Sequence, residues 1–219
     1  MLKRVIDLTH TLNNDVKPWP GDSGPKIKRI SSLENGDCSN VTELTLTTHI
    51  GTHMDCQRHM LPTGYFTDDI DVSFFIGSGR AFDFRSKVKY TDGRAELGPD
   101  CLDGLELDGV DFLFFYLGWD KKWNTPEFFD NFPCINEQLA SKLALLPIRG
   151  IGFETPGIDP VSSTTLSAHK IYLKQKKTVI ENLTNIDKLL DKKFTYVGLP
   201  LKIEQGDGSP IRAVAILED

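Results

Sequence analysis

The stretch Phe112-Leu-Phe-Phe-Tyr-Leu117 is the longest uninterrupted apolar run in this 219-residue chain. Neighbouring side chains of a strand point to opposite faces, so a strand built from this run is apolar on both sides. Such a strand belongs in the middle of a sheet that is covered on both faces. A run of six residues is also far short of the roughly 20 that cross a membrane. We therefore place 111–117 at the centre of a sheet and expect no membrane partner.

Shorter runs rich in β-branched and aromatic residues surround this strand. Together with their turn-forming flanks they predict strands at 5–8, 41–47, 79–84, 150–154, 178–181, 196–201 and 211–217. A stripe of Ile135, Leu139, Leu143 and Leu146 predicts a helix capped by Asn136. A second helix is predicted at about 164–173, and Thr125-Pro-Glu127 resembles a helix start.

No internal repeat, low-complexity block or flexible linker divides the chain. Strands outnumber helices, and the two kinds of element are mixed along the sequence. We therefore predict an α/β fold in which residues 1–219 form a single compact domain with a mixed β-rich core and few flanking helices.

The overall charge argues against nucleic acid as a partner. The chain has 25 Lys and Arg against 31 Asp and Glu, a net charge of −6, and its pI is about 5.4. Backbone phosphates require a concentrated basic face, which this composition does not favour.

The N-terminal sequence and the cysteines indicate the compartment. Met1–Asp7 reaches an acidic side chain before any long apolar run, so we predict no signal peptide and a cytoplasmic protein. Cys38, Cys56, Cys101 and Cys134 form no C-x-x-C pair and are expected to be reduced thiols.

The strongest chemical signal is a cluster of histidines. Three of the five histidines lie within His49-Ile-Gly-Thr-His-Met-Asp-Cys-Gln-Arg-His59. If the strand predicted at 41–47 stays extended through Asp55, then His49, His53 and Asp55 point to one face, with Gly51 as a gap between them. Gly51 and the threonines around it disfavour a helix here.

Two imidazoles and a carboxylate on one face suit a divalent metal ion. Zn²⁺ and Mn²⁺ both accept this ligand set, and three protein ligands leave a position open for water. Non-haem iron is a third possibility, because it also binds two histidines and one carboxylate. His59 could then serve as an acid/base group beside the metal.

Three further residues carry a weaker signal. Taken alone, His169 is a histidine on a helix face, Glu181 an acidic residue at a strand end, and Trp19 a packed aromatic beside the Pro20-Gly21 turn. Taken one at a time, these residues therefore indicate structural roles only.

The segment His49–His59 resembles the H-x-G-T-H-x-D-x-x-x-H motif of the cyclase-like metal-dependent hydrolases, which include bacterial kynurenine formamidase (arylformamidase) and isatin hydrolase. The resemblance extends over most of the chain and implies a compact α/β domain that forms a homodimer or a larger homo-oligomer. Its flanking motifs, in the family's order, are Ile6-Asp-Leu-Thr9, Trp19-Pro-Gly21, Ile158-Asp-Pro160, His169 with Glu181, and Gly208-Ser-Pro-Ile-Arg-Ala-Val214.

The resemblance implies a site for two divalent cations, with Zn²⁺ expected first and Mn²⁺ second. It implies that His49 and His53 bind one ion, that His169 binds the other, and that the carboxylates Asp55 and Glu181 contact both. It also implies that His59 is the general acid/base and that Trp19 contacts the substrate. For His169, Glu181 and Trp19 these roles replace the structural interpretations given above.

One departure from the family pattern concerns the substrate. Formamidases of this family usually read Asp-Ala-Pro where this chain reads Asp55-Cys-Gln-Arg58. Loss of the proline is expected to loosen the turn that carries His59. Arg58 adds a positive charge, and we predict that it binds a substrate carboxylate.

The resemblance implies a metal-dependent amidohydrolase that acts on non-peptide C–N bonds. The leading reaction is hydrolysis of N-formylkynurenine to formate and L-kynurenine, a step of tryptophan catabolism through the kynurenine pathway. The alternative is a cyclic amide or lactone, as for isatin hydrolase. In either case the partner is a small molecule, an aromatic or carboxylate-bearing amide.

Two functions of other classes remain open. One is a cysteine hydrolase with Cys56 as nucleophile and His59 as base. The other is a non-catalytic protein that binds a small molecule through the metal site. An acid/base histidine beside the ligands favours the metal-dependent enzyme over both.

Overall fold

The central strand predicted from the sequence is confirmed. A computed structural model describes residues 4–217, and in it β8 (Phe112–Tyr116) is buried at all five positions. Phe112 and Phe114 pack on one face of the sheet against Tyr196, whereas Phe115 stacks on the other face against Phe153. Two separate hydrophobic clusters therefore lie on opposite faces of the same strand.

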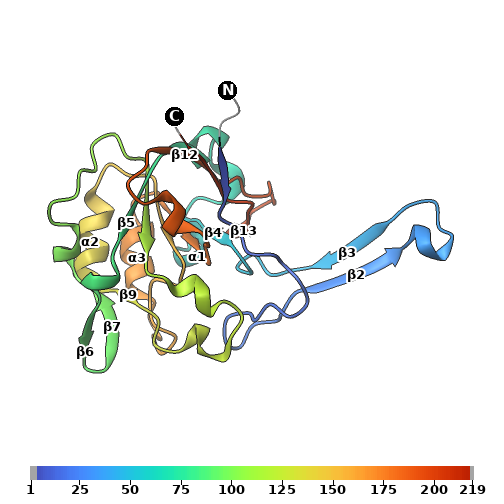
Figure 1. Cartoon of the computed structure of the whole chain (residues 1–219), viewed down its shortest axis with the longest axis horizontal. Coiled ribbons are helices and arrows are strands. Elements are labelled where there is room, and N and C mark those ends of the chain that lie inside the picture. The colour runs from blue at the N-terminus through green and yellow to red at the C-terminus, as the bar shows by residue number, and fades with distance from the viewer. Residues whose placement is uncertain (1–3, 218–219) are drawn as a thin grey trace.

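A mixed sheet surrounds β8 and forms the body of the molecule. Its other strands are β1 (Val5–Asp7), β4 (His53–Asp55), β5 (Ile76–Asp83), β10 (Gly150–Phe153), β11 (Thr178–Glu181), β12 (Phe194–Val197), β13 (Gly208–Pro210) and β14 (Val214–Leu217). The order of the nine strands is β1-β14-β12-β5-β8-β10-β11-β4-β13 (Figure 1). The middle strands β5, β8, β10 and β11 are parallel, and the strands outside them pair antiparallel.

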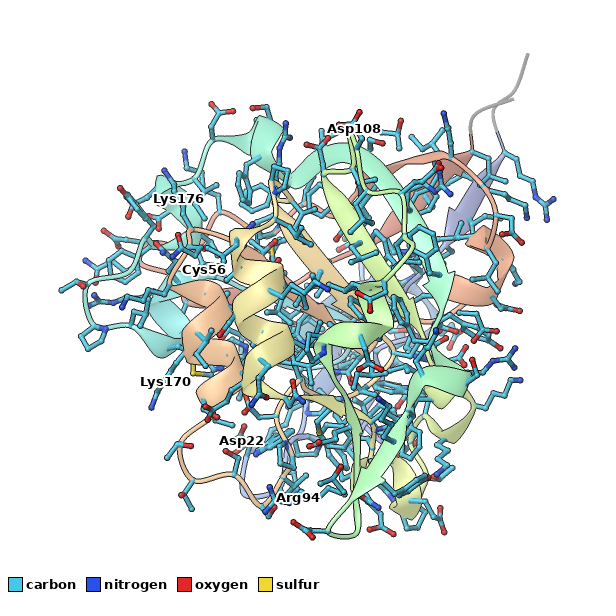
Figure 2. The ribbon with its side chains drawn as sticks, turned by 90° about the vertical axis from the view of Figure 1, so that its left-hand side faces the viewer. Asp22, Cys56, Arg94, Asp108, Lys170 and Lys176 are labelled. Atoms are coloured by element: carbon cyan, nitrogen blue, oxygen red, sulfur yellow. The ribbon has the colours of Figure 1, made fainter. Side chains whose placement is uncertain are left out.

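The remaining elements are few. Within residues 4–217 the helices are α1 (Gln57–Met60), α2 (Glu137–Leu145) and α3 (Ser167–Leu173). One small sheet pairs β2 (Lys26–Ser31) with β3 (Val41–Thr45), and another joins β6 (Lys89–Thr91), β7 (Arg94–Leu97) and β9 (Cys134–Ile135). Helices α2 and α3 lie side by side over one face of the main sheet (Figure 2). The predicted α/β fold with a β-rich core and few helices is confirmed.

Several predicted boundaries shift. The strand predicted at 196–201 lies earlier, at Phe194–Val197, and Pro200 beyond it forms only an isolated bridge with Ile211. The predicted cap Asn136 is confirmed, since its Oδ1 accepts a hydrogen bond from the Leu139 N–H at 2.9 Å, but Ile135 of the predicted apolar stripe belongs to β9 and not to the helix. The helix start predicted at 125–127 is a single 3-10 turn.

The structure leaves two predictions at the chain ends outside its scope. Residues 1–3 and 218–219 of the domain predicted over 1–219 lie outside the described residues. Residues 1–3 also belong to the N-terminal segment Met1–Asp7 that was used to predict the compartment. Within 4–217, none of the helices has both the length and the apolar character required to cross a membrane.

Glu154, just after β10, predicts a pH-dependent stability. Its side chain is buried, and Oε2 accepts hydrogen bonds from the Leu117 and Trp119 N–H groups at 2.8 and 3.1 Å, while Oε1 has no partner among the described residues. Burial and the nearby charge of Asp120 raise the pKa of Glu154 from 4.5 to about 8. The folded protein therefore keeps a proton that the unfolded chain loses.

We expect the free energy of unfolding to decrease as pH rises from 4.5 to about 8, by up to about 1.4 kcal/mol per pH unit from this group. Urea unfolding of the native chain and of Glu154→Gln, at several pH values in this window, measures the contribution. The variant should lose this part of the slope. Equal slopes in both proteins would show that Glu154 is ionised in the folded state.

Candidate metal centre

The histidine-rich segment does not form one continuous strand. β3 ends at Thr45, the chain turns over 48–52, and β4 begins at His53. The strand predicted at 41–47 therefore ends two residues early, and the condition that it stays extended through Asp55 is not met. Gly51 lies in the turn with a φ of +63°, a left-handed conformation that glycine adopts without strain.

The turn nevertheless brings His49 to the site. Its Nδ1 lies 2.7 Å from Oδ1 of Asp55. The ring approaches the neighbouring strand so closely that a Cβ on Gly208 would lie 2.6 Å from His49 Cε1. A larger residue at 208 would displace the imidazole, so this approach requires glycine.

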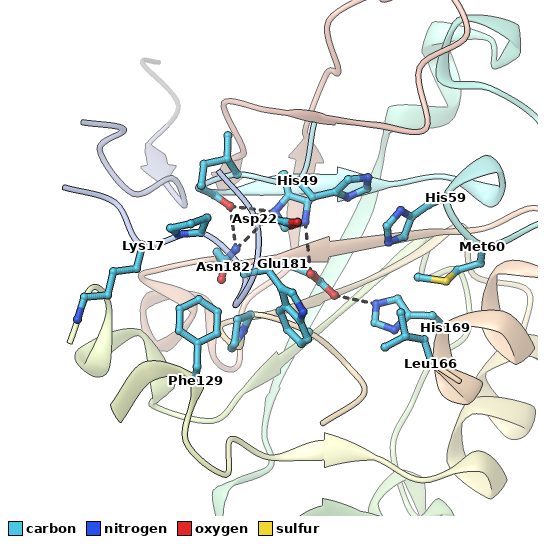
Figure 3. Close-up of a pocket in the computed structure, with 17 residues that line it drawn as sticks. Lys17, Asp22, His49, His59, Met60, Phe129, Leu166, His169, Glu181 and Asn182 are labelled. Carbon is cyan, nitrogen blue, oxygen red and sulfur yellow. Dashed lines mark hydrogen bonds and ion pairs between the residues drawn. The ribbon is translucent and has the colours of Figure 1, made fainter. Parts of the chain in front are cut away.

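His53 and Asp55 lie on the same face of β4, as predicted. The antiparallel pairing of β4 with β11 sets His53 opposite Glu181. His53 Nε2 lies 3.4 Å from Asp55 Oδ1 and 3.3 Å from Glu181 Oε2. His169, on α3, completes the group, since its Nε2 lies 3.0 Å from Glu181 Oε1 (Figure 3). The same Nε2 lies 3.6 Å from Asp55 Oδ2. The five side chains predicted as ligands therefore converge, and four of them are buried.

Hydrogen bonds outside the cluster orient two of the imidazoles. His53 Nδ1 lies 2.9 Å from the Gly51 carbonyl and must donate to it, because a carbonyl only accepts. His169 Nδ1 similarly lies 2.7 Å from Oδ2 of Asp159. In the neutral rings both Nε2 lone pairs then face the carboxylate oxygens of Asp55 and Glu181, an arrangement that requires a positive charge between them.

The electrostatics of the cluster agree with that requirement. Burial opposes protonation of the imidazoles, but the surrounding carboxylates outweigh it and raise the pKa of His49 to about 9 and those of His53 and His169 to about 10. Two triads have donor atoms within 4.8 Å of one another and could each hold a metal ion: His49, Asp55 and His59, and His53, Asp55 and Glu181. Imidazole nitrogens and carboxylate oxygens suit Zn²⁺ or Mn²⁺, so the residues present fit divalent cations.

Asp159 supports the cluster from outside, and its role was not predicted from the sequence. Besides His169 Nδ1, its carboxylate accepts hydrogen bonds from the Ala168 and His169 N–H groups at 3.0 and 2.9 Å. These contacts hold the imidazole of His169 in one orientation and one tautomer.

We expect Asp159→Asn to weaken metal binding or turnover by about 10- to 100-fold, the usual cost of losing an orienting partner behind a metal ligand. Competition with a chromogenic chelator measures the affinity. Asp83→Asn is the matched control, because Asp83 pairs with Arg85 on the exposed surface. An Asp159 variant with the affinity and turnover of the control would show that His169 needs no such support.

His59 lies on the short helix α1 and faces the cluster. Its ring centroid is 3.8 Å from that of His49, and its Nδ1 is 3.7 Å from Oδ2 of Asp207. The same Oδ2 lies 3.0 Å from His49 Nε2. Hydrogen bonds to His49 and His59 hold the pKa of Asp207 far below its usual range. Asp207 was not predicted, although it directly precedes the Gly208-Ser-Pro210 motif.

A cavity of about 160 Å³ opens onto the cluster of candidate metal ligands (Figure 3). Trp19, Phe129 and Leu166 are among its apolar lining residues. The Trp19 ring meets Phe129 edge-on, with 6.0 Å between centroids. Trp19 therefore lies at the cavity, and its contact with a substrate stays a prediction. Asn182 also lines it, held by a hydrogen bond from Nδ2 to the Gly51 carbonyl at 2.8 Å, and no sequence signal had indicated it.

The structure does not bring Arg58 together with the cluster. Its guanidinium lies 4.5 Å from the centroid of the Phe66 ring and donates a hydrogen bond to the Pro62 carbonyl. Arg58 is also absent from the cavity lining.

The turn that carries His59 is well tied despite the missing proline. The Cys56 Sγ lies 3.2 Å from the carbonyl oxygens of both Tyr65 and Asp207, which share its single S–H donor. Gln57 Nε2 donates to the carbonyl of Lys174 at 3.2 Å. These bonds replace the rigidity that a proline would supply.

The chain shows clear similarity to known proteins. A family model described as "Putative cyclase" matches residues 6–160. Kynurenine formamidase of Bacillus mycoides is 32% identical over 209 residues, which cover 95% of each chain, and that of Bacillus anthracis has the same identity and coverage.

Solved structures agree on the fold. An isatin hydrolase bound to the product analogue thioisatinate has a TM-score of 0.85 at 24% identity, over 98% of this chain and 92% of that one. Isatin hydrolase A from Labrenzia aggregata has a TM-score of 0.83 at 25% identity, over 99% and 94% of the two chains.

Proposed function

This chain belongs to the cyclase family, and we propose that it is a metal-dependent enzyme that hydrolyses the C–N bond of a small amide. The observation that carries the proposal is the convergence of three imidazoles and two buried carboxylates, four of these five side chains lining a cavity that also has aromatic walls. Divalent cations held there would polarise a carbonyl oxygen and lower the pKa of water to near neutrality. His49, His53, Asp55, His169 and Glu181 are the residues proposed to hold them.

His59 is the proposed general acid/base. It lines the cavity beside His49 and is within reach of a substrate atom there. An amine anion is too basic to depart unprotonated, so a proton delivered by His59 to the leaving nitrogen would allow the C–N bond to break. Asp207, 3.7 Å from His59 Nδ1, would favour the orientation in which the other ring nitrogen faces the substrate.

The leading substrate is N-formylkynurenine, which would yield formate and L-kynurenine. The support is the 32% identity to kynurenine formamidases along 95% of the chain and an indole, Trp19, placed where an aryl ring could pack. This would place the enzyme in the kynurenine pathway of tryptophan catabolism. A cyclic amide or lactone is the second candidate, because isatin hydrolase A matches 99% of the chain.

The substrate proposal assigns no contact to Arg58, since its guanidinium packs on Phe66. Binding of a substrate carboxylate by Arg58 stays a prediction. It would require the side chain to leave this position.

Formate release from N-formylkynurenine tests the proposal. Protein loaded with Zn²⁺ or with Mn²⁺ is compared with the same protein after chelation, and its metal content is measured. Rapid, chelator-sensitive release is the expected result. If protein carrying two ions releases no formate but opens isatin-like lactams, the substrate is wrong and the enzyme class stands. Tight ligand binding without turnover of either substrate class would indicate a non-catalytic binding protein.

The cysteine-hydrolase alternative makes a separate prediction. Burial raises the pKa of the Cys56 thiol to about 11, and the thiol donates to backbone carbonyls instead of facing the cavity. We therefore expect Cys56→Ala to keep turnover within a few-fold of the native chain and to remain chelator-sensitive. Steady-state kinetics with and without chelator measure both. Complete loss of activity in Cys56→Ala, with chelator-insensitive activity in the native chain, would instead support a cysteine nucleophile.

The proposal also covers the metal content and the oligomeric state. We propose two ions per chain, with Zn²⁺ preferred over Mn²⁺, in a homodimer or a larger homo-oligomer. Elemental analysis measures the number and identity of the ions, and sedimentation measures the oligomeric state. A cytoplasmic location stays a prediction from the sequence.

A further inference from the structure

Leu166 combines an unfavourable backbone conformation with a large apolar side chain. Its φ is +48° and its ψ is +52°, which lie in the left-handed region. Of the nine non-glycine residues with positive φ within 4–217, Leu166 is the only apolar one; asparagine, aspartate, lysine and glutamine occupy the other positions. Left-handed backbone costs free energy for most residues, and glycine and asparagine tolerate it best. Leucine is therefore locally unfavourable at this position.

The same position forgoes a helix cap. Leu166 is the N-cap of α3, and its side chain makes no capping hydrogen bond, which an asparagine, aspartate, serine or threonine can supply at such a position. Main-chain bonds hold the conformation instead. The Leu166 N–H donates to Ser163 Oγ at 3.0 Å, and the Leu166 carbonyl accepts from the Lys170 N–H at 3.1 Å. Neither bond involves the side chain, so neither requires leucine.

The hydrophobic core does not explain the leucine either. Leu166 is half-buried, and among the described residues it belongs to neither hydrophobic cluster nor to the partly buried side chains that pack against them. Ile171, on the same helix, does pack against one of these clusters. Leu166 instead lines the cavity near His169 (Figure 3). Because backbone strain persists mainly at functional sites, the reason for the leucine should lie in the cavity.

The apolar side of the cavity is fixed in place. The Trp19 ring meets Phe129 and Phe132 at centroid distances of 6.0 and 6.4 Å. Gly157 lies against the indole, since a Cβ at this glycine would be 3.3 Å from Trp19 Cζ3. Leu166 adds an aliphatic surface only three residues before the candidate ligand His169. An apolar group attached to a carbonyl at the ligand cluster would therefore meet Leu166 first.

We propose that Leu166 is a specificity-determining residue, which contacts the apolar group on the scissile amide nitrogen and so favours aromatic amides over small aliphatic ones. This role rests on the proposed amide hydrolysis. Asparagine or glycine at 166 would relieve the backbone strain, but would leave a polar or an empty wall where the substrate ring packs. The strained leucine is retained for that contact.

The ratio of kcat/KM for formanilide to kcat/KM for N-methylformamide tests the proposal. Both values come from one sample, so differences in metal content cancel. Leu166→Asn should lower the ratio by at least about tenfold, the effect of a lost apolar contact in a pocket. Leu166→Met keeps an apolar side chain of similar volume and should retain the ratio. Lys176→Asn is the matched control, because Lys176 has a φ of +46°, is exposed and lies outside the cavity lining.

Thermal unfolding distinguishes this role from a structural one. Asparagine suits left-handed backbone better than leucine does, so Leu166→Asn should melt at the native temperature or above it. A leucine that served the core would make the same variant less stable. An unchanged ratio of kcat/KM values, or a melting temperature several degrees below the native one, would overturn the proposal.

Binding of formanilide to the chelated protein, measured by calorimetry, gives a readout that is independent of turnover. The native chain should bind formanilide at least about tenfold more tightly than Leu166→Asn does. If this difference appears but the metal-loaded native chain hydrolyses neither formamide, the proposed function fails and the role of Leu166 stands. Equal binding by the two proteins, with rapid hydrolysis of formanilide by the native chain, would keep the proposed function and overturn the role of Leu166.

Discussion

His59→Ala is expected to retain its divalent ions and to lose about 10²- to 10⁴-fold in turnover, the usual contribution of a general acid/base. The reason lies in the position of His59. Its ring centroid lies 3.8 Å from that of His49 at the cavity wall. Although its donor atoms lie within 4.8 Å of those of His49 and Asp55, His59 is not among the five residues proposed as ligands. Removal of the ring should leave the metal site intact and take away the proton donor for the leaving nitrogen.

Steady-state kinetics together with elemental analysis of the same sample measure the two effects separately. His10→Gln provides a matched control, because His10 stacks on Trp123 and lies outside the cavity lining. Turnover of that variant should stay near that of the native chain. A His59→Ala protein with native turnover would remove His59 from the mechanism, and one that has lost its metal would make His59 a ligand.

Asp55→Asn is expected to have the largest effect on metal binding. Asp55 is 1% exposed, and its two oxygens lie within 3.6 Å of imidazole nitrogens of His49, His53 and His169. The substitution removes a negative charge that three candidate ligands share. The affinity should therefore fall by more than the roughly 100-fold upper range seen for partners behind a ligand, and turnover should fall with it.

Metal titration and the increase in melting temperature on adding Zn²⁺ measure this loss, since a ligand that binds only the folded state stabilises it. Asp207→Asn is the informative comparison. Asp207 contacts His49 and His59 from the outer side, so its loss should weaken metal binding far less. An Asp55→Asn protein that holds two ions as tightly as the native chain would disprove the shared, bridging role.

The sequence was informative where local pattern and burial coincide. The apolar run at 112–117 placed the central strand, because a strand without a polar face can only be buried on both sides. His53 and Asp55 were predicted to share a face, and the alternation of β4 confirms it. Asn136 was predicted as a helix cap for equally local reasons.

Local pattern was insufficient for His49. Period-two alternation assumed an extended chain, whereas a turn through Gly51 separates β3 from β4. The reason is tertiary: β3 pairs with β2 in a separate two-stranded sheet, and β4 pairs with β11 and β13 in the main sheet. One strand could not serve both sheets, so the chain bends between them.

The sequence by itself determined the central strand and, through its resemblance to the cyclase-like hydrolases, predicted which residues could serve as ligands. Tertiary structure alone decided which side chains support that site. Asn182 is 131 residues from Gly51 along the chain, yet its Nδ2 lies 2.8 Å from the Gly51 carbonyl. Asp207 is 158 residues from His49, yet the two side chains are 3.0 Å apart. Such pairings depend on the order of strands in the sheet and on the docking of α3, and no local pattern records either. Arg58 shows the opposite. Its position in the sequence next to His59 indicated a place at the cavity, but its guanidinium packs on Phe66, away from the candidate ligands.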